Sequence, residues 1–327
     1  MHYLVTGGAG YIGSHMVALL LEQGHRVTVV DDLSSGHRDA VLGGDLIVHD
    51  FSDRDFLDRL FTEHRFDGVF HFASRILVGE SVSQPGKYYR SNSFATLTLL
   101  EAMRDHGVDY LVFSSTAAVY GEPAYTPIDE RHPRVPVNPY GASKLMVEMM
   151  LADFYRAHGL RYVALRYFNA AGADARGRLG ECHEPETHLI PLALKAALGK
   201  LPPLKLFGDD YDTPDGTCIR DYIHVEDLCA AHLQAMQYMK NGGEPTAFNL
   251  GNGAGYSVRQ VLDTVADVSG KPVPFELASR RPGDPARLIA DATRAQTILH
   301  WNPAHTELAT IVHHAWQWEC RQEGVRP

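Results

Sequence analysis

The chain has 327 residues, of which 45% are hydrophobic and 21% are charged, a balance that excludes a disordered or fibrous protein. A formal net charge of −10 excludes the basic surface that non-specific nucleic-acid binding needs. No apolar run is long enough to span a bilayer, and a strand-like run begins at the third residue, which leaves no room for a signal peptide. We therefore expect a cytoplasmic protein with no nucleic-acid or membrane partner.

Short apolar runs alternate with helix-like stretches through the first half of the chain. The run Tyr3–Val5 leads into a glycine-rich turn, and a helical pattern over Ser14–Gln23 precedes the run Val27–Val30, which ends at Asp31. Further runs of the same kind are Leu46–Val48, Val69–Phe72 and Leu111–Phe113. The alternation predicts an α/β fold with a doubly wound parallel sheet of the Rossmann type.

The pattern loosens past Asn169. Helical periodicity returns over Val225–Met239, and a strand-like run follows at Ala247–Leu250. We predict a nucleotide-binding Rossmann domain over residues 1–168, to which residues 221–250 return, and a smaller substrate-binding domain over residues 169–327.

The turn after the first strand reads G-x-G-x-x-G at Gly8, Gly10 and Gly13, and with Gly7 it also fits G-x-x-G-x-x-G. Such a turn brings bare backbone close to a pyrophosphate at a helix N-terminus. Asp31 ends the next strand, where a carboxylate accepts hydrogen bonds from ribose hydroxyls and repels a 2′-phosphate. These features predict NAD as the cofactor in preference to NADP.

Tyr140 and Lys144 form a Y-x-x-x-K pair, and four-residue spacing places both side chains on one face of a helix. Of the fifteen tyrosines, only Tyr140 has this partner. A free tyrosine has a pKa of about 10, which nearby cations lower toward neutrality, so that the phenol can act as a base. Ser115 and Thr116 end the preceding strand, at the edge where such sheets bind ligands, and either hydroxyl can contact a reacting hydroxyl.

The four cysteines (Cys182, Cys218, Cys229 and Cys320) form no CxxC pair, so we expect reduced thiols. Eighteen histidines show no HExxH or H-x3-H spacing, and we expect no metal.

Together the glycine turn, Asp31, Asn92, Thr116, Tyr140 and Lys144 resemble the extended short-chain dehydrogenase/reductase family. Longer segments resemble its UDP-glucose (UDP-galactose) 4-epimerase branch: Thr6–His15, His71–Ser81, Phe113–Gly121, Pro139–Glu148, Arg166–Asn169, Phe207–Asp227 and Arg280–Asp284. The resemblance covers essentially the whole chain and implies an isomerase that uses NAD.

The resemblance also implies site residues. Thr116, Tyr140 and Lys144 form the implied catalytic trio. The implied NAD contacts are Gly7, Gly10, Tyr11, Ile12, Gly13, Asp31, Asp32, Asp50, Phe51, Phe72, Ala73, Arg75, Asn92, Ser114, Ser115, Tyr140, Lys144 and Phe168. The implied UDP-hexose contacts are Thr116, Tyr140, Asn169, His188, Leu189, Lys205, Leu206, Phe207, Arg220, Arg281, Asp284 and Leu288. In the alternative interpretation, Arg220 and Arg281 only pair with neighbours such as Asp221 and Asp284.

Three positions depart from the family pattern. Thr116 replaces the common serine but keeps its hydroxyl, Arg75 stands at or beside a position where relatives carry lysine, and Leu288 occupies a sugar-pocket position that varies. The implied reaction interconverts UDP-glucose and UDP-galactose by inverting carbon 4 through a 4-keto sugar. By the same resemblance the protein is a homodimer joined through the helices Ser93–His106 and Tyr140–His158.

Other functions stay open at this point. A 4-epimerase acting on UDP-N-acetylglucosamine or on a UDP-pentose fits the same motifs. A nucleotide-sugar 4,6-dehydratase or a UDP-glucuronate decarboxylase fits less well, because such relatives carry an acid after the serine or threonine and this chain has Ala117 and Ala118. A non-catalytic NAD sensor has no need of Tyr140 and Lys144.

Overall fold

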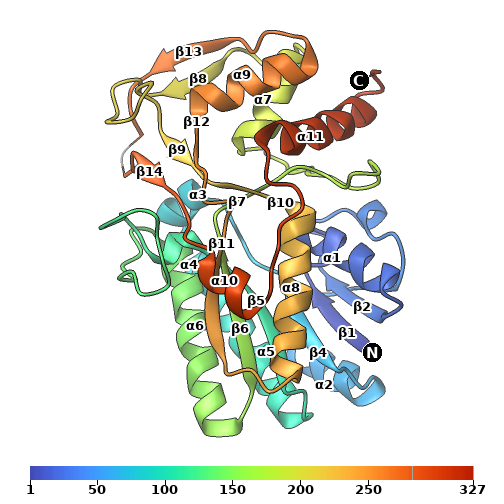
Figure 1. Ribbon diagram of the computed structural model, residues 1–327. Coiled ribbons are helices and arrows are strands. Elements are labelled where there is room, and N and C mark those ends of the chain that lie inside the picture. Colours follow the sequence, from blue (N-terminus) through green and yellow to red (C-terminus); the bar gives the residue numbers. More distant parts are fainter. Residues whose placement is uncertain (282, 327) are drawn as a thin grey trace.

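The computed structural model describes residues 1–281 and 283–326 (Figure 1). Pro282, inside the segment Arg280–Asp284, and Pro327, the end of the predicted second domain, lie outside the described residues.

A seven-stranded parallel sheet forms the centre of the larger body. Its order is β11-β6-β5-β4-β1-β2-β3, so the chain winds outward from β1 in both directions, and the predicted fold class is confirmed. The strands are β1 (His2–Thr6), β2 (Arg26–Asp31), β3 (Asp45–Val48), β4 (Gly68–His71), β5 (Tyr110–Thr116), β6 (Arg161–Tyr167) and β11 (Thr246–Leu250).

Helices cover both faces of this sheet, which is why the interior of its strands is rich in apolar residues on both faces. On one face, Val5 and Val29 pack with Met16 of α1 (Tyr11–Glu22) and with α8 (Val225–Lys240). The other face of the same strands presents Leu4 and Val30 to the second layer of helices. That layer is made of α2 (Arg54–Glu63), α5 (Ala95–Asp105) and α6 (Pro139–His158).

Local signals fix the helix that carries the Y-x-x-x-K pair. The Asn138 side chain caps α6 by accepting a hydrogen bond from the Gly141 amide at 2.9 Å, and Pro139 occupies the first turn. Gly159, with φ of 77°, ends the helix. By contrast, α1 begins at Tyr11, three residues before the predicted start, because Gly10 itself is the N-cap.

A smaller body lies above the sheet in Figure 1. Its core joins α7 (Leu189–Ala197), α9 (Val258–Ser269) and α11 (Leu308–Gln322) to the strand pair β8 (Leu204–Phe207) and β13 (Phe275–Ala278). Short strands complete this region: β7 (Asn169–Ala171) with β10 (Tyr222–His224), and β9 (Ile219–Arg220) between β12 (Tyr256–Ser257) and β14 (Arg287–Leu288).

Six further short helical segments belong to the fold, the first of which is the 3₁₀ turn η1 (Arg38–Ala40). The other five follow later in the chain. They are α3 (Val78–Ser83), α4 (Pro85–Tyr88), the π-helix η2 (Tyr89–Phe94), the 3₁₀ turn η3 (Ala117–Val119) and α10 (Thr293–Ile298). Both α8 and β11 lie with the larger body, although they come late in the chain (Figure 1). The domain boundary at residue 168 stays a prediction. Among the described helices, none combines the length and apolar character that crossing a membrane requires.

Candidate active site

The glycine turn between β1 and α1 has no room for a side chain at Gly7, Gly8 or Gly13. A Cβ on Gly7, whose φ is 74°, would lie 2.5 Å from the Ala73 amide nitrogen, and one on Gly13 would lie 2.1 Å from the Gly7 carbonyl oxygen. Because the N-cap of α1 is Gly10, no side chain occupies the amides of the first turn. The turn therefore offers backbone donors and a helix dipole to an anion such as a pyrophosphate.

Asp31 is fixed at the end of β2 beside this turn. One carboxylate oxygen accepts the Ala9 amide and the other accepts the Leu33 amide, each at 2.9 Å. The side chain is 8% exposed, and burial raises its pKa. Each oxygen keeps a further acceptor site, which suits two ribose hydroxyls and not a 2′-phosphate. The turn and Asp31 thus fit NAD.

The other predicted cofactor residues lie on loops along this edge. Asp32 is exposed after β2, Asp50 is exposed and Phe51 half-buried after β3, and Phe72 and Ala73 directly follow β4. The Asn92 side chain holds the next loop, because it accepts the Arg75 amide at 2.8 Å and donates to the Arg75 carbonyl at 3.0 Å. Asn92 also donates to the Ser143 hydroxyl of α6 at 3.1 Å. Its interactions therefore position the backbone of this loop against α6.

Lys144 is almost fully buried on α6. Its ammonium donates to the Ser114 carbonyl at 2.8 Å and to the Ser74 hydroxyl at 3.0 Å, and it lies 4.9 Å from the Phe113 ring centre. Burial lowers the pKa of Lys144 to about 7. The lysine therefore joins the loop after β4 to the end of β5, and its buried charge is easily lost.

Tyr140 lies one turn earlier on α6, near Thr116 at the end of β5. Burial raises the pKa of Tyr140, and a hydrogen bond with Thr116 opposes that rise. Thr116 is 8% exposed and its hydroxyl also accepts the Ala118 amide at 3.1 Å. The sequence led us to expect a lowered phenol pKa, but the protein groups alone shift it the other way, because desolvation outweighs them. A lowered pKa requires a further positive charge in the site.

The side chain of Ser115 corrects one expectation. It is fully buried and donates to a Glu148 carboxylate oxygen at 2.6 Å, on the side of β5 away from Thr116. Alternate residues of a strand point to opposite faces, so Ser114 and Thr116 share one face and Ser115 takes the other. The Ser115 hydroxyl therefore lies outside the candidate site, whereas the Ser114 hydroxyl hydrogen-bonds Tyr167 at 2.5 Å.

Several predicted sugar-nucleotide residues lie where the two bodies meet. Asn169 begins β7 and donates to the Asp221 carbonyl at 2.8 Å, while His188 and Leu189 begin α7. On β8, Lys205 is exposed and Phe207 is half-buried. The Leu206 side chain is 2% exposed within the core of the smaller body. Only its backbone remains for a ligand.

Asp284 joins both predicted phosphate-binding arginines. It pairs with Arg220, which is 13% exposed, and accepts from Arg281 at 2.8 Å. Arg281 also lies over the Phe207 ring, 5.0 Å from its centre. Pairing with Asp284 thus agrees with the alternative interpretation. Asp221 pairs with neither arginine, since its carboxylate accepts three backbone amides.

Phe168 and Leu288 pack against one small cluster of apolar residues at the end of β5, comprising Ala117, Val119, Tyr120 and Ile128. This contact brings the variable position 288 beside the strand that carries Thr116.

Sequence reasoning missed two polar groupings. The first is a buried network in which Glu148 binds both Ser115 and Arg166. The second is formed by Glu181, His183, Glu186 and His188. The short stretch 183–188, with a histidine and a glutamate repeated in six residues, was the available signal for the second grouping.

Fold and site together define a Rossmann-type enzyme that uses NAD. Residues 3–251 match the NAD dependent epimerase/dehydratase family. The chain is 54% identical to the UDP-glucose 4-epimerase of Halalkalibacterium halodurans, over 97% of this chain and 95% of the relative. The chain therefore belongs to the NAD-dependent epimerase/dehydratase family.

Solved structures agree with this assignment. The UDP-glucose 4-epimerase of Brucella ovis in complex with NAD superposes with a TM-score of 0.94 at 48% identity, covering 96% of this chain and 97% of that one. The UDP-Glc/GlcNAc 4-epimerase of Campylobacter jejuni superposes with a TM-score of 0.86 at 43% identity, covering 98% and 99%. The predicted family, enzyme class and cofactor are confirmed, while the role of each site residue stays a proposal.

Proposed function

We propose that the protein interconverts UDP-glucose and UDP-galactose by inverting carbon 4 of the hexose. The observation that carries this proposal is the meeting of Tyr140 and Thr116 at the carboxyl end of β5, with Lys144 buried behind them and the glycine turn on the same edge of the sheet. This arrangement pairs a proton acceptor with a dinucleotide site.

The chemistry that NAD supplies when bound is reversible hydride transfer at carbon 4. Tyr140 takes the proton of the 4-hydroxyl as that carbon is oxidised to a ketone, and Thr116 holds the oxygen by a hydrogen bond. The 4-keto sugar then rotates in the pocket and presents its other face. Carbon 4 is reduced again on that face, and Tyr140 returns the proton to its oxygen. No net oxidation occurs. Gly7, Gly10, Gly13 and Asp31 would hold the cofactor.

The cations between the two bodies indicate how the diphosphate of the substrate would be bound. Arg220 and Arg281 would take the diphosphate by exchanging part of their pairing with Asp284, because guanidinium groups match phosphate geometry. The 4,6-dehydratase alternative is disfavoured because η3 presents Ala117 and Ala118 after Thr116, so no acid is available there for removing the carbon 5 proton.

We further propose a cytoplasmic homodimer. Phe94 of η2 and Met146 and Met149 of α6 are 64%, 44% and 59% exposed. The Ser93 hydroxyl donates to the Ser143 carbonyl at 3.0 Å, so these apolar side chains share one neighbourhood. Such a patch favours burial against a second copy. Sedimentation of the wild type and of Phe94→Glu tests the dimer, and a monomeric wild type contradicts it.

Turnover tests the function directly. Purified protein is incubated with UDP-galactose alone, and UDP-glucose is quantified by chromatography, with Tyr140→Phe as the control. We expect conversion without added NAD and about one NAD released per chain on denaturation. Protein that contains no nucleotide and yet epimerises at full rate would overturn the cofactor role. Inactivity on UDP-galactose with full activity on UDP-N-acetylglucosamine or on a UDP-pentose would move the proposal to that substrate.

A further inference from the structure

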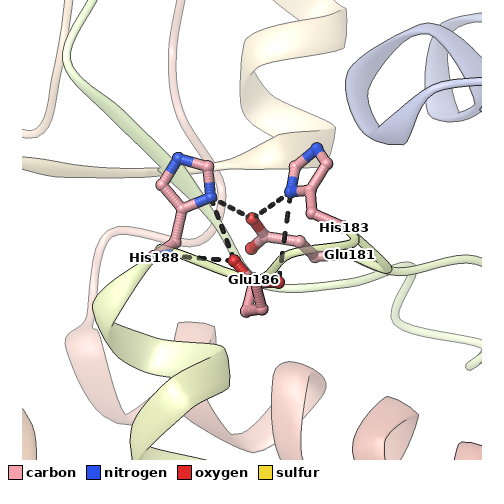
Figure 2. Close-up of side chains that lie close together, drawn as sticks. All are labelled: Glu181, His183, Glu186 and His188. Carbon is pink, nitrogen blue, oxygen red and sulfur yellow. Dashed lines mark hydrogen bonds and ion pairs between the residues drawn. The ribbon is translucent and has the colours of Figure 1, made fainter. Parts of the chain in front are cut away.

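The loop that leads into α7, up to the N-cap residue of that helix, brings two imidazoles and two carboxylates together (Figure 2). We call Glu181, His183, Glu186 and His188 the His–Glu cluster. One ligand atom of each lies within 4.8 Å of the other three. Both histidines present Nδ1 to the carboxylates: His183 lies 2.9 Å from Glu181, and His188 contacts Glu181 and lies 3.4 Å from Glu186.

Both carboxylates of the His–Glu cluster are removed from water. The Glu181 and Glu186 side chains are each 5% exposed. One Glu186 oxygen accepts the backbone amides of Thr187 and His188, at 2.7 and 2.9 Å. Within the described part of the chain the other oxygen, Oε2, is buried without a hydrogen-bond partner, 4.0 Å from His183 Nδ1. A buried carboxylate oxygen with no donor is costly, so this atom points to a missing cation.

The spacing of the ligand atoms suits one small ion. Four ligands about 2.0–2.2 Å from a tetrahedral zinc ion lie about 3.3 Å from one another. His183 Nδ1 lies 2.9 Å from Glu181 Oε1 and 4.0 Å from Glu186 Oε2, on either side of that value, while His188 Nδ1 contacts Glu181 Oε1 more closely. Imidazole nitrogen with carboxylate oxygen is a donor set that zinc accepts.

We propose that the His–Glu cluster is a zinc site, bound by Nδ1 of His183 and His188 and by one oxygen each of Glu181 and Glu186. Four protein ligands leave no open position, so the site is structural and distinct from the Tyr140 chemistry. Two positive charges on zinc balance the two buried carboxylates. The competing occupant is a proton on each imidazole, and the experiment below separates the two.

The position of the cluster indicates what the ion would stabilise. His188 begins α7, and the Glu181 carbonyl accepts the indole N–H of Trp318 on α11 at 2.9 Å. On the other side, His183 lies edge-on to the Tyr11 ring at 6.2 Å, and the Tyr11 hydroxyl donates to the Gly172 carbonyl at 2.7 Å. Zinc at this position would fasten the loop that joins the helices of the smaller body to the cofactor turn.

A second group of possible ligands provides a matched control. His224, Glu226 and His305 also lie close together, but both ring nitrogens of His224 have protein partners. His224 accepts the Glu226 amide at 3.1 Å through Nδ1, and its Nε2 hydrogen-bonds His314 at 2.9 Å. We therefore expect no metal there.

Metal analysis of the intact protein tests the proposal. Protein purified without chelators is measured by inductively coupled plasma mass spectrometry for the wild type, His183→Ala, Glu186→Gln and the control His305→Ala. We expect about one zinc per chain in the wild type and control, and at least tenfold less in the two cluster variants. Bound NAD, measured in parallel, reports that each variant is folded.

A second measurement needs no variant. Wild type stripped of metal is loaded with Co²⁺, and a tetrahedral site is expected to give intense visible absorption that added Zn²⁺ removes. Stoichiometric zinc is also expected to raise the unfolding midpoint of the wild type and not of His183→Ala. Wild type that retains no zinc and takes up none in competition with a chromophoric chelator would overturn the proposal in favour of protonated histidines. Equal zinc content in wild type and both cluster variants would overturn it as well.

Discussion

Two buried cations flank the end of β5, and their surroundings differ. Arg166 of β6 donates to Glu148 through Nε and Nη2, at 2.9 and 2.6 Å. Lys144, four residues before Glu148 on α6, has only a carbonyl and a hydroxyl as acceptors. Within the described residues, no carboxylate lies within ion-pair distance of Lys144. The protein thus pairs one buried charge completely and leaves the other without a counter-ion.

The consequences for the two charges are opposite. Burial alone lowers the pKa of Arg166, but its hydrogen bonds and ion pair with Glu148 raise it above the ordinary value. Burial lowers the pKa of Lys144 to about 7 with nothing to oppose it. Folding gains nothing from an unpaired buried ammonium, and such groups gather at functional sites. We infer that Arg166 serves the architecture and Lys144 the chemistry.

The largest effect is expected where Lys144 and Tyr140 act together. Tyr140→Phe removes the proposed proton acceptor, and we expect turnover to fall by about 10²–10⁴-fold, with UDP affinity changed less than twofold. Steady-state rates and calorimetric titration with UDP measure the two quantities. A rate within threefold of wild type would place the base on another residue. The inference that Lys144 serves the chemistry together with Tyr140 would then be wrong.

The architectural half is tested at Glu148. Glu148→Ala leaves Arg166 buried without its partner, and we expect a loss of about 3–5 kcal/mol in the free energy of unfolding. Asp153→Ala is the matched control on the same helix, because Asp153 pairs with Arg156 while 66% exposed, and such a pair contributes about 0–1 kcal/mol. Chemical denaturation measures both variants. Equal losses would mean that the Glu148–Arg166 pair has no special structural role.

The sequence predicted well those features that local pattern determines. Alternating apolar runs and helices predicted the parallel sheet, and the glycine turn followed by Asp31 identified the cofactor, because each signal lies in one short segment. The pattern of β5 also held the information that Ser114 and Thr116 face together and Ser115 faces away. We had nevertheless offered the Ser115 and Thr116 hydroxyls as alternatives for the same role, and only the hydrogen bond from Ser115 to Glu148 corrected this.

Features that depend on contacts between distant segments could not be predicted. Tyr120 donates to Asn249 across 129 residues, and the Tyr11 hydroxyl donates to the Gly172 carbonyl across 161 residues. The raised pKa of Tyr140 reflects desolvation, which depends on how closely the surrounding elements pack. The His–Glu cluster escaped a search for standard metal spacings, because its carboxylates and imidazoles meet only through the path of the loop.

A pH series sharpens the comparison between the two cations. The pKa of Lys144 falls from 10.5 to about 7 on burial, so between these values the unfolded chain binds more protons there than the native protein does. Stability from this group therefore rises with pH across that window and is lowest below pH 7.

Lys144→Met removes the titration. We expect the free energy of unfolding of wild type, relative to this variant, to rise by on the order of 2 kcal/mol from pH 7 to pH 9. Urea titrations at each pH measure it. Arg166 stays charged throughout this pH range, so it contributes no change in the free energy of unfolding with pH. A flat or falling difference would show that Lys144 keeps its proton and that its site is less dry than its burial indicates.

The smallest expected effect is the change in substrate preference on substitution of Leu288. Leu288 pairs with Arg220 in the small sheet and packs with Phe168 on the cluster at Ala117, next to the strand end that carries Thr116. A leucine there fills less space than a tyrosine and offers no hydrogen bond to an acetamido group, so we expect weak activity on N-acetylated UDP-hexoses beside strong activity on UDP-galactose. Filling or emptying such a pocket changes discrimination by about 1–3 kcal/mol, and because Leu288 is only partly buried we expect the lower end, roughly tenfold.

Leu288→Tyr should raise, and Leu288→Ser should lower, the ratio of kcat/KM for UDP-galactose to that for UDP-N-acetylgalactosamine. Leu277→Ser, on the exposed strand β13, is the control and should leave the ratio unchanged. If Leu288→Tyr and Leu288→Ser shift the ratio in the same direction, Leu288 contributes only to packing and does not determine which sugar is accepted.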